Sequence, residues 1–302
     1  MRIDLHAHSS VSDGTERPAA VVDAAVAAGL DVVALTDHDT TAGWDEALAA
    51  AEGRPIRVIP GAELSTAATD ASGRPRSVHL LAYLFDPDTP ALVAEQTRLR
   101  EERRRRLRRM VRLMADDGLP VDEESVFGGL DADAPAGRPH LARALVRAGV
   151  VRSVDEAFAS YLRDGGPYHL RRADTPLVDA VRMITAAGGV TVLAHPLAGR
   201  RGPAVPDSTI AELAAIGLSG VEVDHPEHDR AARSRLRFLA AELGLVATGG
   251  SDYHGTNKTI ALGAESTERD AFEELLSRVP RPLPLPSAGG TGGRTGTTGT
   301  SG

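Results

Sequence analysis

The sequence has no cysteine among its 302 residues, which excludes disulfide bonds and thiolate metal sites. It also has no excess of basic residues: the formal net charge is -8, so broad, non-specific nucleic-acid binding is not expected. No run of about 18 apolar residues is present, so no transmembrane helix is predicted. The N-terminal MRIDLHAHSS lacks the apolar segment of a signal peptide. These absences favour a cytoplasmic enzyme with no membrane contact and no obligate protein partner.

Short β-branched segments alternate with alanine-rich helical segments along most of the chain. Strands are predicted near residues 2–8, 32–36, 56–59, 78–84, 190–194, 219–223 and 245–249. Helices are predicted at residues 17–28, 43–52, 175–187, 207–216, 229–243 and 268–279. Such alternation is typical of an α/β fold with a parallel sheet and helices outside it. Because no dinucleotide-type glycine-rich turn is present, we expect a closed or nearly closed barrel, with an open doubly wound sheet as the alternative.

The alternation stops between residues 89 and 173. Only helices are predicted there, at about 90–117, 139–149 and 154–163. We therefore expect a barrel domain formed by residues 1–88 and 174–279, interrupted by a helical insertion at 89–173. Residues 280–302, PRPLPLPSAGGTGGRTGTTGTSG, are too poor in apolar side chains to build a core, and we predict a disordered tail.

Histidine and carboxylate side chains recur at the ends of the predicted strands. His6 and His8 are two residues apart on the first strand, so they point in the same direction. The later strands supply Asp37-His38-Asp39, Glu63, His79, His195 and Asp252-Tyr253-His254. In parallel barrels the carboxyl ends of the strands meet at one mouth, where active sites are built. Six of the seven predicted strands would therefore deliver a His, Asp or Glu to one site.

These ligand types narrow the chemistry of the predicted site. Imidazole and carboxylate without thiolate suit Mn²⁺, Zn²⁺ or Fe²⁺. Because the candidates outnumber the four ligands of a tetrahedral zinc, we expect two or three ions that share a bridging carboxylate, with manganese preferred. Metal ions about 3.5–4 Å apart can activate a water and stabilise the leaving oxygen of a phosphate ester. The pattern thus favours phosphate ester hydrolysis.

The ordered motifs resemble those of the PHP (polymerase and histidinol phosphatase) family. Asp4-Leu5-His6-Ala7-His8-Ser9, followed by Ser12-Asp13-Gly14, is similar to its first motif, and the similarity extends over residues 1–265. The resemblance implies a distorted (β/α)7 barrel with a trinuclear site, where a metal-activated hydroxide attacks phosphorus. The implied ligands are His6, His8, Glu63 and Asp252 for one metal, Glu63, His79 and His195 for a second, and Asp13, His38 and His254 for a third. Glu63 would be the bridge, and Asp252, His195 and Glu63 are the expected catalytic residues.

The insertion carries Gly137-Arg138-Pro139-His140 and Gly165-Gly166-Pro167-Tyr168. These motifs resemble the branch of the family that acts on nucleotide phosphates, which includes 3',5'-nucleotide bisphosphate phosphatases and a 5'-3' exoribonuclease. The resemblance implies a small phosphorylated nucleotide, or a short 5'-phosphorylated RNA, as the substrate. Candidate substrate-binding residues are Arg138, His140, Tyr168 and Arg200. Packing is the alternative for Tyr168, and a solvated loop is the alternative for Arg200.

Two other charged segments allow more than one interpretation, and a third has one expected role. We interpret the arginine-rich stretch Arg98–Arg112 as a solvated helix, with contact to an RNA backbone as the alternative. His225 and His228 are expected in a surface loop, with substrate binding or proton donation as the alternative. Asp37 and Asp39 are expected to orient ligand histidines.

Other functions stay as alternatives. Histidinol phosphate is a third possible substrate, although the nucleotide-type insertion is unexpected for it. An amidohydrolase with a carboxylated-lysine bridge is disfavoured, because the only lysine, Lys258, follows the seventh strand. A degenerate, non-catalytic polymerase module is disfavoured because none of the expected ligands is missing.

Overall fold

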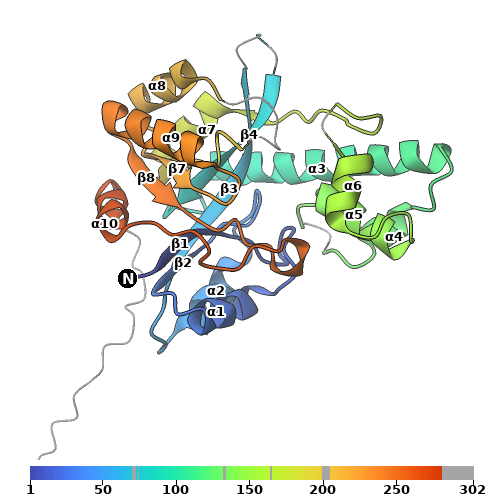
Figure 1. Cartoon of the computed structure of the whole chain (residues 1–302), viewed down its shortest axis with the longest axis horizontal. Coiled ribbons are helices and arrows are strands. Elements are labelled where there is room, and N and C mark those ends of the chain that lie inside the picture. The colour runs from blue at the N-terminus through green and yellow to red at the C-terminus, as the bar shows by residue number, and fades with distance from the viewer. Residues whose placement is uncertain (70–72, 74, 132–133, 164, 199–204, 281–302) are drawn as a thin grey trace, which may run out of the picture.

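The computed structural model describes residues 1–302 except 70–72, 74, 132–133, 164, 199–204 and 281–302. Its main sheet curves into a nearly closed barrel in the order β1-β2-β3-β4-β6-β7-β8 (Figure 1). The strands are β1 (Ile3–Ala7), β2 (Val32–Leu35), β3 (Arg57–Thr69), β4 (Pro75–Tyr83), β6 (Val190–Leu193), β7 (Gly220–Asp224) and β8 (Val246–Gly249). A short β5 (Thr175–Pro176), which was not predicted, pairs with β3. The tail for which disorder was predicted lies outside the described residues from residue 281 onward.

The sheet is not parallel throughout. The pairs β1–β2, β2–β3, β6–β7 and β7–β8 are parallel, but β4 runs antiparallel to both β3 and β6. The expectation of a parallel sheet is therefore wrong at β4. Only five residues separate Thr69 from Pro75, which is too short for a crossover to a parallel strand. As a result the first half of β4 lies at the mouth, where His79 pairs in register with Ser65 of β3.

The barrel closes where the segment after β8 meets β1. Ala7 and Tyr253 form a parallel bridge, and the His8 N–H donates to the Tyr253 carbonyl at 2.8 Å. This approach requires glycine at residue 250, because a Cβ there would lie 2.4 Å from the His6 Cβ. The contact therefore holds the two histidines of β1 next to the segment that carries Asp252.

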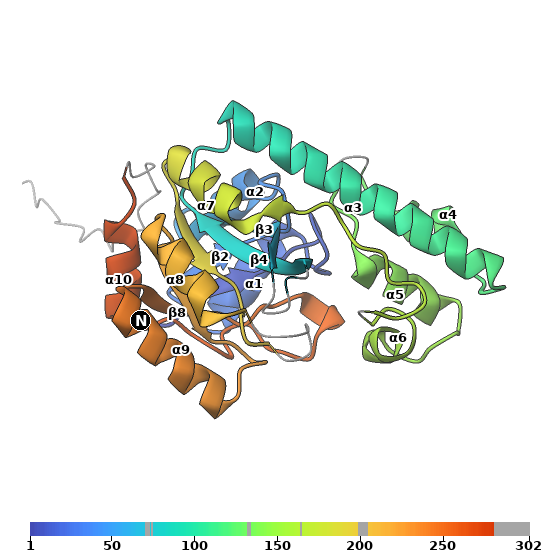
Figure 2. The same ribbon diagram turned by 90° about the horizontal axis from the view of Figure 1, so that it is seen from above.

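Helices cover the outside of the barrel (Figures 1 and 2). They are α1 (Pro18–Ala27), α2 (Trp44–Ala51), α7 (Leu177–Ala186), α8 (Asp207–Ala215), α9 (Arg230–Leu243) and α10 (Arg269–Ser277). On α7, Leu177, Val181 and Ile184 recur at helical spacing and are buried in the same core as Leu193 of β6. In the described part of the chain, no helix has the length and apolarity needed to cross a membrane.

The insertion consists of α3 (Pro90–Asp116), α4 (Glu123–Phe127), α5 (Arg138–Arg147) and α6 (Val154–Ser160). Figure 2 shows α3 running from the barrel to the three short helices. Leu92, near its start, is buried in the barrel core, whereas Met110 and Met114, near its end, belong to a separate core shared with α5 and α6. The helix thus connects two hydrophobic cores and passes beside the barrel mouth between them.

Candidate metal centre

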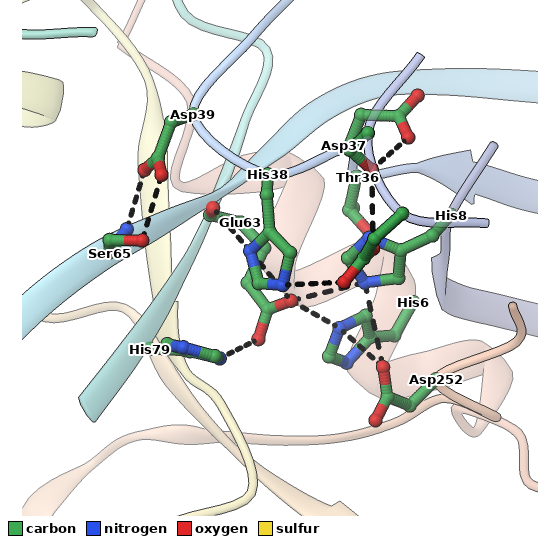
Figure 3. A network of polar contacts seen from close by, with 12 residues as sticks. His6, His8, Thr36, Asp37, His38, Asp39, Glu63, Ser65, His79 and Asp252 are labelled. Atoms are coloured by element: carbon green, nitrogen blue, oxygen red, sulfur yellow. Dashed lines mark hydrogen bonds and ion pairs between the residues drawn. The ribbon is translucent and has the colours of Figure 1, made fainter. Parts of the chain in front are cut away.

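Glu63 of β3 lies at the centre of the histidine cluster and is 1% exposed. One carboxylate oxygen, Oε2, is 3.3 Å from His6 Nε2 and 3.0 Å from His8 Nε2. The other, Oε1, is 2.7 Å from His79 Nδ1 and 2.9 Å from His195 Nε2. Figure 3 shows the carboxylate between His6, His8 and His79. The two oxygens of one side chain therefore face imidazoles from three other strands or strand ends.

The potential ligand atoms fall into three overlapping groups, within each of which the atoms lie within 4.8 Å of one another. The groups are His6, His8, Glu63 and Asp252; His8, Asp13, His38 and His254; and His38, Glu63 and His79. His195 joins the cluster through its contact with Glu63. The structure thus brings all of the predicted ligands to one place, but His8 and His38 each fall in two groups, where the sequence interpretation placed each in one.

The orientation of the buried atoms fits a cation. His6 Nε2, His8 Nε2 and Glu63 Oε2 are buried, and among the described residues they have no hydrogen-bond partner, although they lie close together. Buried polar atoms are normally hydrogen-bonded. These three atoms lie close together but do not hydrogen-bond to one another, so a common partner between them would satisfy all three. Imidazole nitrogens and carboxylate oxygens suit a divalent transition metal. The donor set therefore fits a metal ion.

The charges of the cluster are strongly coupled. Burial opposes ionisation of Glu63, but His79, His38 and His6 outweigh it and hold the pKa of this carboxyl well below its usual value. Burial also opposes protonation of His6, yet Glu222, Glu63 and Asp252 hold its pKa well above the usual value. The carboxylates therefore attract positive charge into the mouth, and a metal ion would bind there in competition with protons.

Two of the predicted ligands adopt backbone conformations that are uncommon outside glycine. His195, just after β6, has a φ of 30°, and Asp252, just after β8, has a φ of 52°. Such conformations persist only where the surroundings hold them. For His195 that support is visible, because its N–H donates to Glu222 Oε2 at 2.8 Å.

Glu222 of β7 is a part of the site that the sequence interpretation missed. It is 1% exposed, and its Oε1 lies 2.9 Å from His6 Nδ1 while its Oε2 accepts from the His195 N–H. A carboxylate on one imidazole nitrogen fixes the ring so that the other nitrogen is free to bind a metal. The signal in the sequence was a charged residue in the middle of the apolar strand Gly-Val-Glu-Val-Asp.

Asp37 and Asp39 were expected to orient ligand histidines, but in the described part of the chain they hydrogen-bond to serines, so this expectation is wrong. Asp37 accepts from the backbone N–H and hydroxyl of Ser9, at 2.8 and 2.6 Å, and from the Ser12 hydroxyl at 2.5 Å. Asp39 accepts from the N–H and hydroxyl of Ser65, at 2.7 and 2.8 Å (Figure 3). These aspartates fix the neighbouring backbone of the mouth, including the loop before Asp13.

One face of α3 lies against the mouth. Arg103 is 5% exposed and donates to Asp39 Oδ2 and to the Ser65 hydroxyl, both at 2.5 Å. The interpretation of this helix as solvated is therefore wrong for that face, although Arg105 and Arg109 are exposed. The apolar stripe of the helix was the signal, because Arg103 stands at helical spacing from its buried leucines.

Arg106 is repelled by two other arginines, Arg172 and Arg138, of which Arg172 pairs with Asp174 at 2.9 Å. The Arg106 Nε donates to the Leu170 carbonyl at 2.5 Å. Burial lowers the pKa of Arg106 to about 9, and repulsion from Arg172 and Arg138 adds to this. Of the predicted substrate-binding residues, Arg138 therefore belongs to a cationic group, and its guanidinium also donates to the Leu162 carbonyl at 2.8 Å.

The other predicted substrate-binding residues are differently placed. His140 is 4% exposed, its Nδ1 accepts from the Gly137 N–H at 3.1 Å at the start of α5, and burial lowers its pKa to about 4. Tyr168 packs in the insertion core, and its hydroxyl donates to Asp117, just past the end of α3, at 2.7 Å. That point is about 20 Å along the helix from Arg103, so Tyr168 packs away from the mouth. Arg200 lies outside the described residues.

The two histidines of the loop after β7 are buried, so the expectation of a plain surface loop is wrong for them. His225 is 1% exposed, with its Nε2 3.4 Å from Asp252 Oδ2. His228 is 3% exposed, with its Nδ1 2.9 Å from the Val223 carbonyl. The same Asp252 oxygen accepts from Lys258 Nζ at 2.5 Å. The lysine thus contacts one predicted ligand and does not bridge two.

Comparisons with known proteins agree with this geometry. A family model described as PHP domain matches residues 4–121. The chain is 35% identical to a 3',5'-nucleoside bisphosphate phosphatase from Chromobacterium violaceum over 93% of this chain and 98% of that protein. It is 34% identical to a 5'-3' exoribonuclease from Haemophilus influenzae over 87% of this chain and 93% of that protein. A solved structure from Bifidobacterium adolescentis, described as a metal-dependent phosphoesterase, superposes with a TM-score of 0.87 at 36% identity, covering 91% of this chain and 96% of that one. The chain therefore belongs to the PHP domain family and is an enzyme of the metal-dependent phosphoesterase class.

Proposed function

We propose that this chain hydrolyses a phosphate monoester of a nucleotide of the 3',5'-bisphosphate type, with two or three divalent metal ions, preferably Mn²⁺. The observation that carries the proposal is Glu63, whose two oxygens face four imidazoles inside a buried cluster. Similarity to a 3',5'-nucleoside bisphosphate phosphatase over almost the whole of both chains supports the substrate class.

The residues of the chain divide the work of the site. Metal ions bound at such a cluster supply an activated water and stabilise the leaving oxygen of the ester. Glu63 spaces the ligand groups, and Glu222 holds His6 and the backbone of His195 in place. The ligand histidines must be neutral to bind metal, so occupancy of the centre decreases at low pH.

The arginines near Arg106 in the insertion support an anionic substrate. Arg172, Arg138 and Arg103 repel the Arg106 guanidinium and lower its pKa, although Arg172 pairs with Asp174 at 2.9 Å and Arg103 pairs with Asp39. A phosphate placed among them would replace repulsion with charge-assisted hydrogen bonds. We propose that Arg106 and Arg138 bind phosphate oxygens of the substrate from the insertion side.

A phosphoester panel with added Mn²⁺ tests the proposal. It should contain a nucleoside 3',5'-bisphosphate, histidinol phosphate and a 5'-phosphorylated RNA, and we expect the bisphosphate to have the highest kcat/KM. His6→Ala should abolish turnover while circular dichroism shows a retained fold. Activity that survives complete removal of metal would contradict the mechanism, and preference for histidinol phosphate would contradict the substrate class.

A second candidate function is 5'-3' trimming of 5'-phosphorylated RNA. The exposed face of α3 is the part that an RNA backbone could contact, because Arg105 and Arg109 are exposed there, whereas Arg103 is buried against Asp39. Similarity to a 5'-3' exoribonuclease over 93% of its length also supports it. The kcat/KM for a mononucleotide bisphosphate, compared with that for a 5'-phosphorylated tetranucleotide, separates the two functions.

A further inference from the structure

The two oxygens of Asp252 face different neighbours. Its Oδ1 lies 3.4 Å from His6 Nε2 and 3.5 Å from His8 Nε2, and Figure 3 shows this oxygen turned toward the two histidines. Its Oδ2 accepts from Lys258 Nζ at 2.5 Å and lies 3.4 Å from His225 Nε2. Lys258 and His225 belong to none of the three groups of potential ligand atoms. The carboxylate therefore presents one oxygen to the predicted metal centre and the other to two side chains outside it.

The contacts of His225 define which of its nitrogens carries the proton. The Glu227 N–H donates to His225 Nδ1 at 3.0 Å, so Nδ1 supplies a lone pair and the proton of the neutral ring is on Nε2. Nε2 is the nitrogen that faces Asp252 Oδ2. An imidazole nitrogen must be deprotonated to bind a metal, so this nitrogen is placed to donate a hydrogen bond and not to act as a further ligand.

Lys258 reaches Asp252 because the chain turns back between them. A single 3₁₀ turn, η2 (Gly255–Asn257), ends at Lys258, and its first residue has a positive φ of 63°. Lys258 Nζ donates to the Asp252 carbonyl at 3.3 Å as well as to Oδ2. Asp252 has a φ of 52°, a conformation that its surroundings must hold. The lysine thus contacts both the backbone and the side chain of a residue that needs this support.

Two opposite effects of Lys258 on metal binding can be distinguished. A donor on the outer oxygen of a ligand carboxylate fixes the orientation of that ligand, and loss of such a partner typically weakens metal binding about 10–100-fold. A cation beside a metal centre also repels the metal, so its removal alone would strengthen binding. His225 is neutral and faces the same oxygen as Lys258. Two donors from separate segments, only one of them charged, therefore favour orientation over charge as the shared role.

We propose that Lys258 and His225 are positioning residues of the metal centre, which hold Asp252 Oδ2 so that Asp252 binds a divalent metal through Oδ1. The inference rests on the proposed function, because it concerns a ligand of the metal centre assigned there. Without the two donors the carboxylate is free to rotate, and Oδ1 no longer stays beside His6 and His8. The loop after β7 and the turn after β8 thus act on the metal centre without supplying these two side chains as ligands.

Calorimetry of Mn²⁺ binding to the chelator-treated, full-length protein tests the proposal without substrate. Lys258→Met and His225→Leu each remove one donor, and each should raise the Kd of at least one Mn²⁺ ion about tenfold or more. Lys258→Arg and His225→Gln keep an N–H donor and should recover much of the affinity that is lost in the matching variant. Arg235→Met removes a half-exposed arginine of α9 that pairs with Asp207, and this control should bind Mn²⁺ as the wild type does. Circular dichroism checks that each variant is folded.

Kinetics with a nucleoside 3',5'-bisphosphate distinguish positioning from substrate binding. In Lys258→Met the Mn²⁺ concentration for half-maximal activity should rise, whereas KM at saturating Mn²⁺ should stay at the wild-type value. A raised KM with an unchanged Mn²⁺ dependence would mean that Lys258 binds substrate, and tighter Mn²⁺ binding would mean that it only repels the metal; either result overturns the proposal. Unchanged Mn²⁺ affinity in both donor-removing variants overturns it as well. A wild-type protein that binds Mn²⁺ but hydrolyses no ester would refute the proposed function, and calorimetry would still decide the role of Lys258 and His225.

Discussion

The barrel mouth and the insertion above it are both rich in charged side chains, but the two regions arrange them in opposite ways. In the mouth, carboxylates such as Glu63 and Glu222 lie among imidazoles, and the cluster attracts cations. In the insertion, Arg103 pairs with Asp39 and Arg172 with Asp174, but burial and repulsion from Arg172 and Arg138 still lower the pKa of Arg106, so an anion beside Arg106 would be stabilising. Neither region alone would bind both the metal ions and the phosphate, because the mouth favours cations and the insertion favours anions.

This difference explains how one site can bind metals and phosphate together. The mouth is built on strand ends, where the sheet fixes the ligand positions, whereas Arg106 and Arg138 stand on helices α3 and α5 of the insertion. A direct link between the regions is Arg103, which reaches from α3 to Asp39 and Ser65 of the barrel. The following predictions test the separation of the two regions, from the largest expected effect to the smallest.

Glu63→Gln tests whether the mouth depends on its central carboxylate. The amide keeps the shape but loses the negative charge that both ligand groups share, so bound metal should decrease and kcat should fall at least about a thousandfold, which corresponds to several kcal/mol. Elemental analysis of the purified protein reports the metal, and kinetics report the rate. Glu46→Gln, in a surface pair with Arg17, is the control and should retain both.

Arg103→Met tests the link between the regions. The substitution keeps much of the side-chain volume but leaves Asp39 buried without its cation, and breaking such a pair costs about 3–5 kcal/mol. The free energy of unfolding in urea should fall by this amount. Arg105→Met on the same helix removes an exposed arginine paired with Glu102 and should change stability by less than about 0.5 kcal/mol. Equal losses in the two variants would show that Arg103 does not connect the regions.

Glu222→Gln tests whether a carboxylate behind the ligands prepares the mouth. His6 and the His195 N–H face different oxygens of Glu222, so in the amide one of them would face the NH₂ group and lose its acceptor. Loss of such supporting partners typically weakens metal binding by about 10–100-fold, which calorimetry of Mn²⁺ binding to the chelator-treated protein would measure. Asp224→Asn, on the same strand but paired with surface Arg233 and Arg237, should bind Mn²⁺ as the wild type does.

The two regions also differed in how well the sequence predicted them. The ligands of the mouth were accessible because a histidine or carboxylate at the end of an apolar strand has few structural roles, and their order along the chain is specific. Long-range contacts, such as that of Glu222 with His6 or of Lys258 with Asp252, could not be predicted, because strand patterns do not show which side chains meet across a barrel. The antiparallel β4 was missed because the short β3–β4 connection was not identified as a hairpin. The insertion was less predictable, since arginines on a helix are usually solvated and only the apolar stripe distinguishes Arg103.

The smallest effect concerns the pH dependence of the insertion through His140. Burial lowers the pKa of His140 to about 4, below its ordinary value of 6.5, so between these values the unfolded chain binds more protons than the folded chain. This residue therefore destabilises the fold as pH decreases, by about 2 kcal/mol between pH 7 and pH 5. His6 has a raised pKa, so its effect on the free energy of unfolding has the opposite sign. The effect of His140 is therefore measured as the difference between the wild type and His140→Asn under identical conditions. Urea unfolding from pH 7 to pH 5 should show the wild type losing stability relative to this variant. If the free energy of unfolding of the two proteins changed equally with pH, burial would not lower the pKa of His140, and the neutral ring would not be needed to accept from the Gly137 N–H.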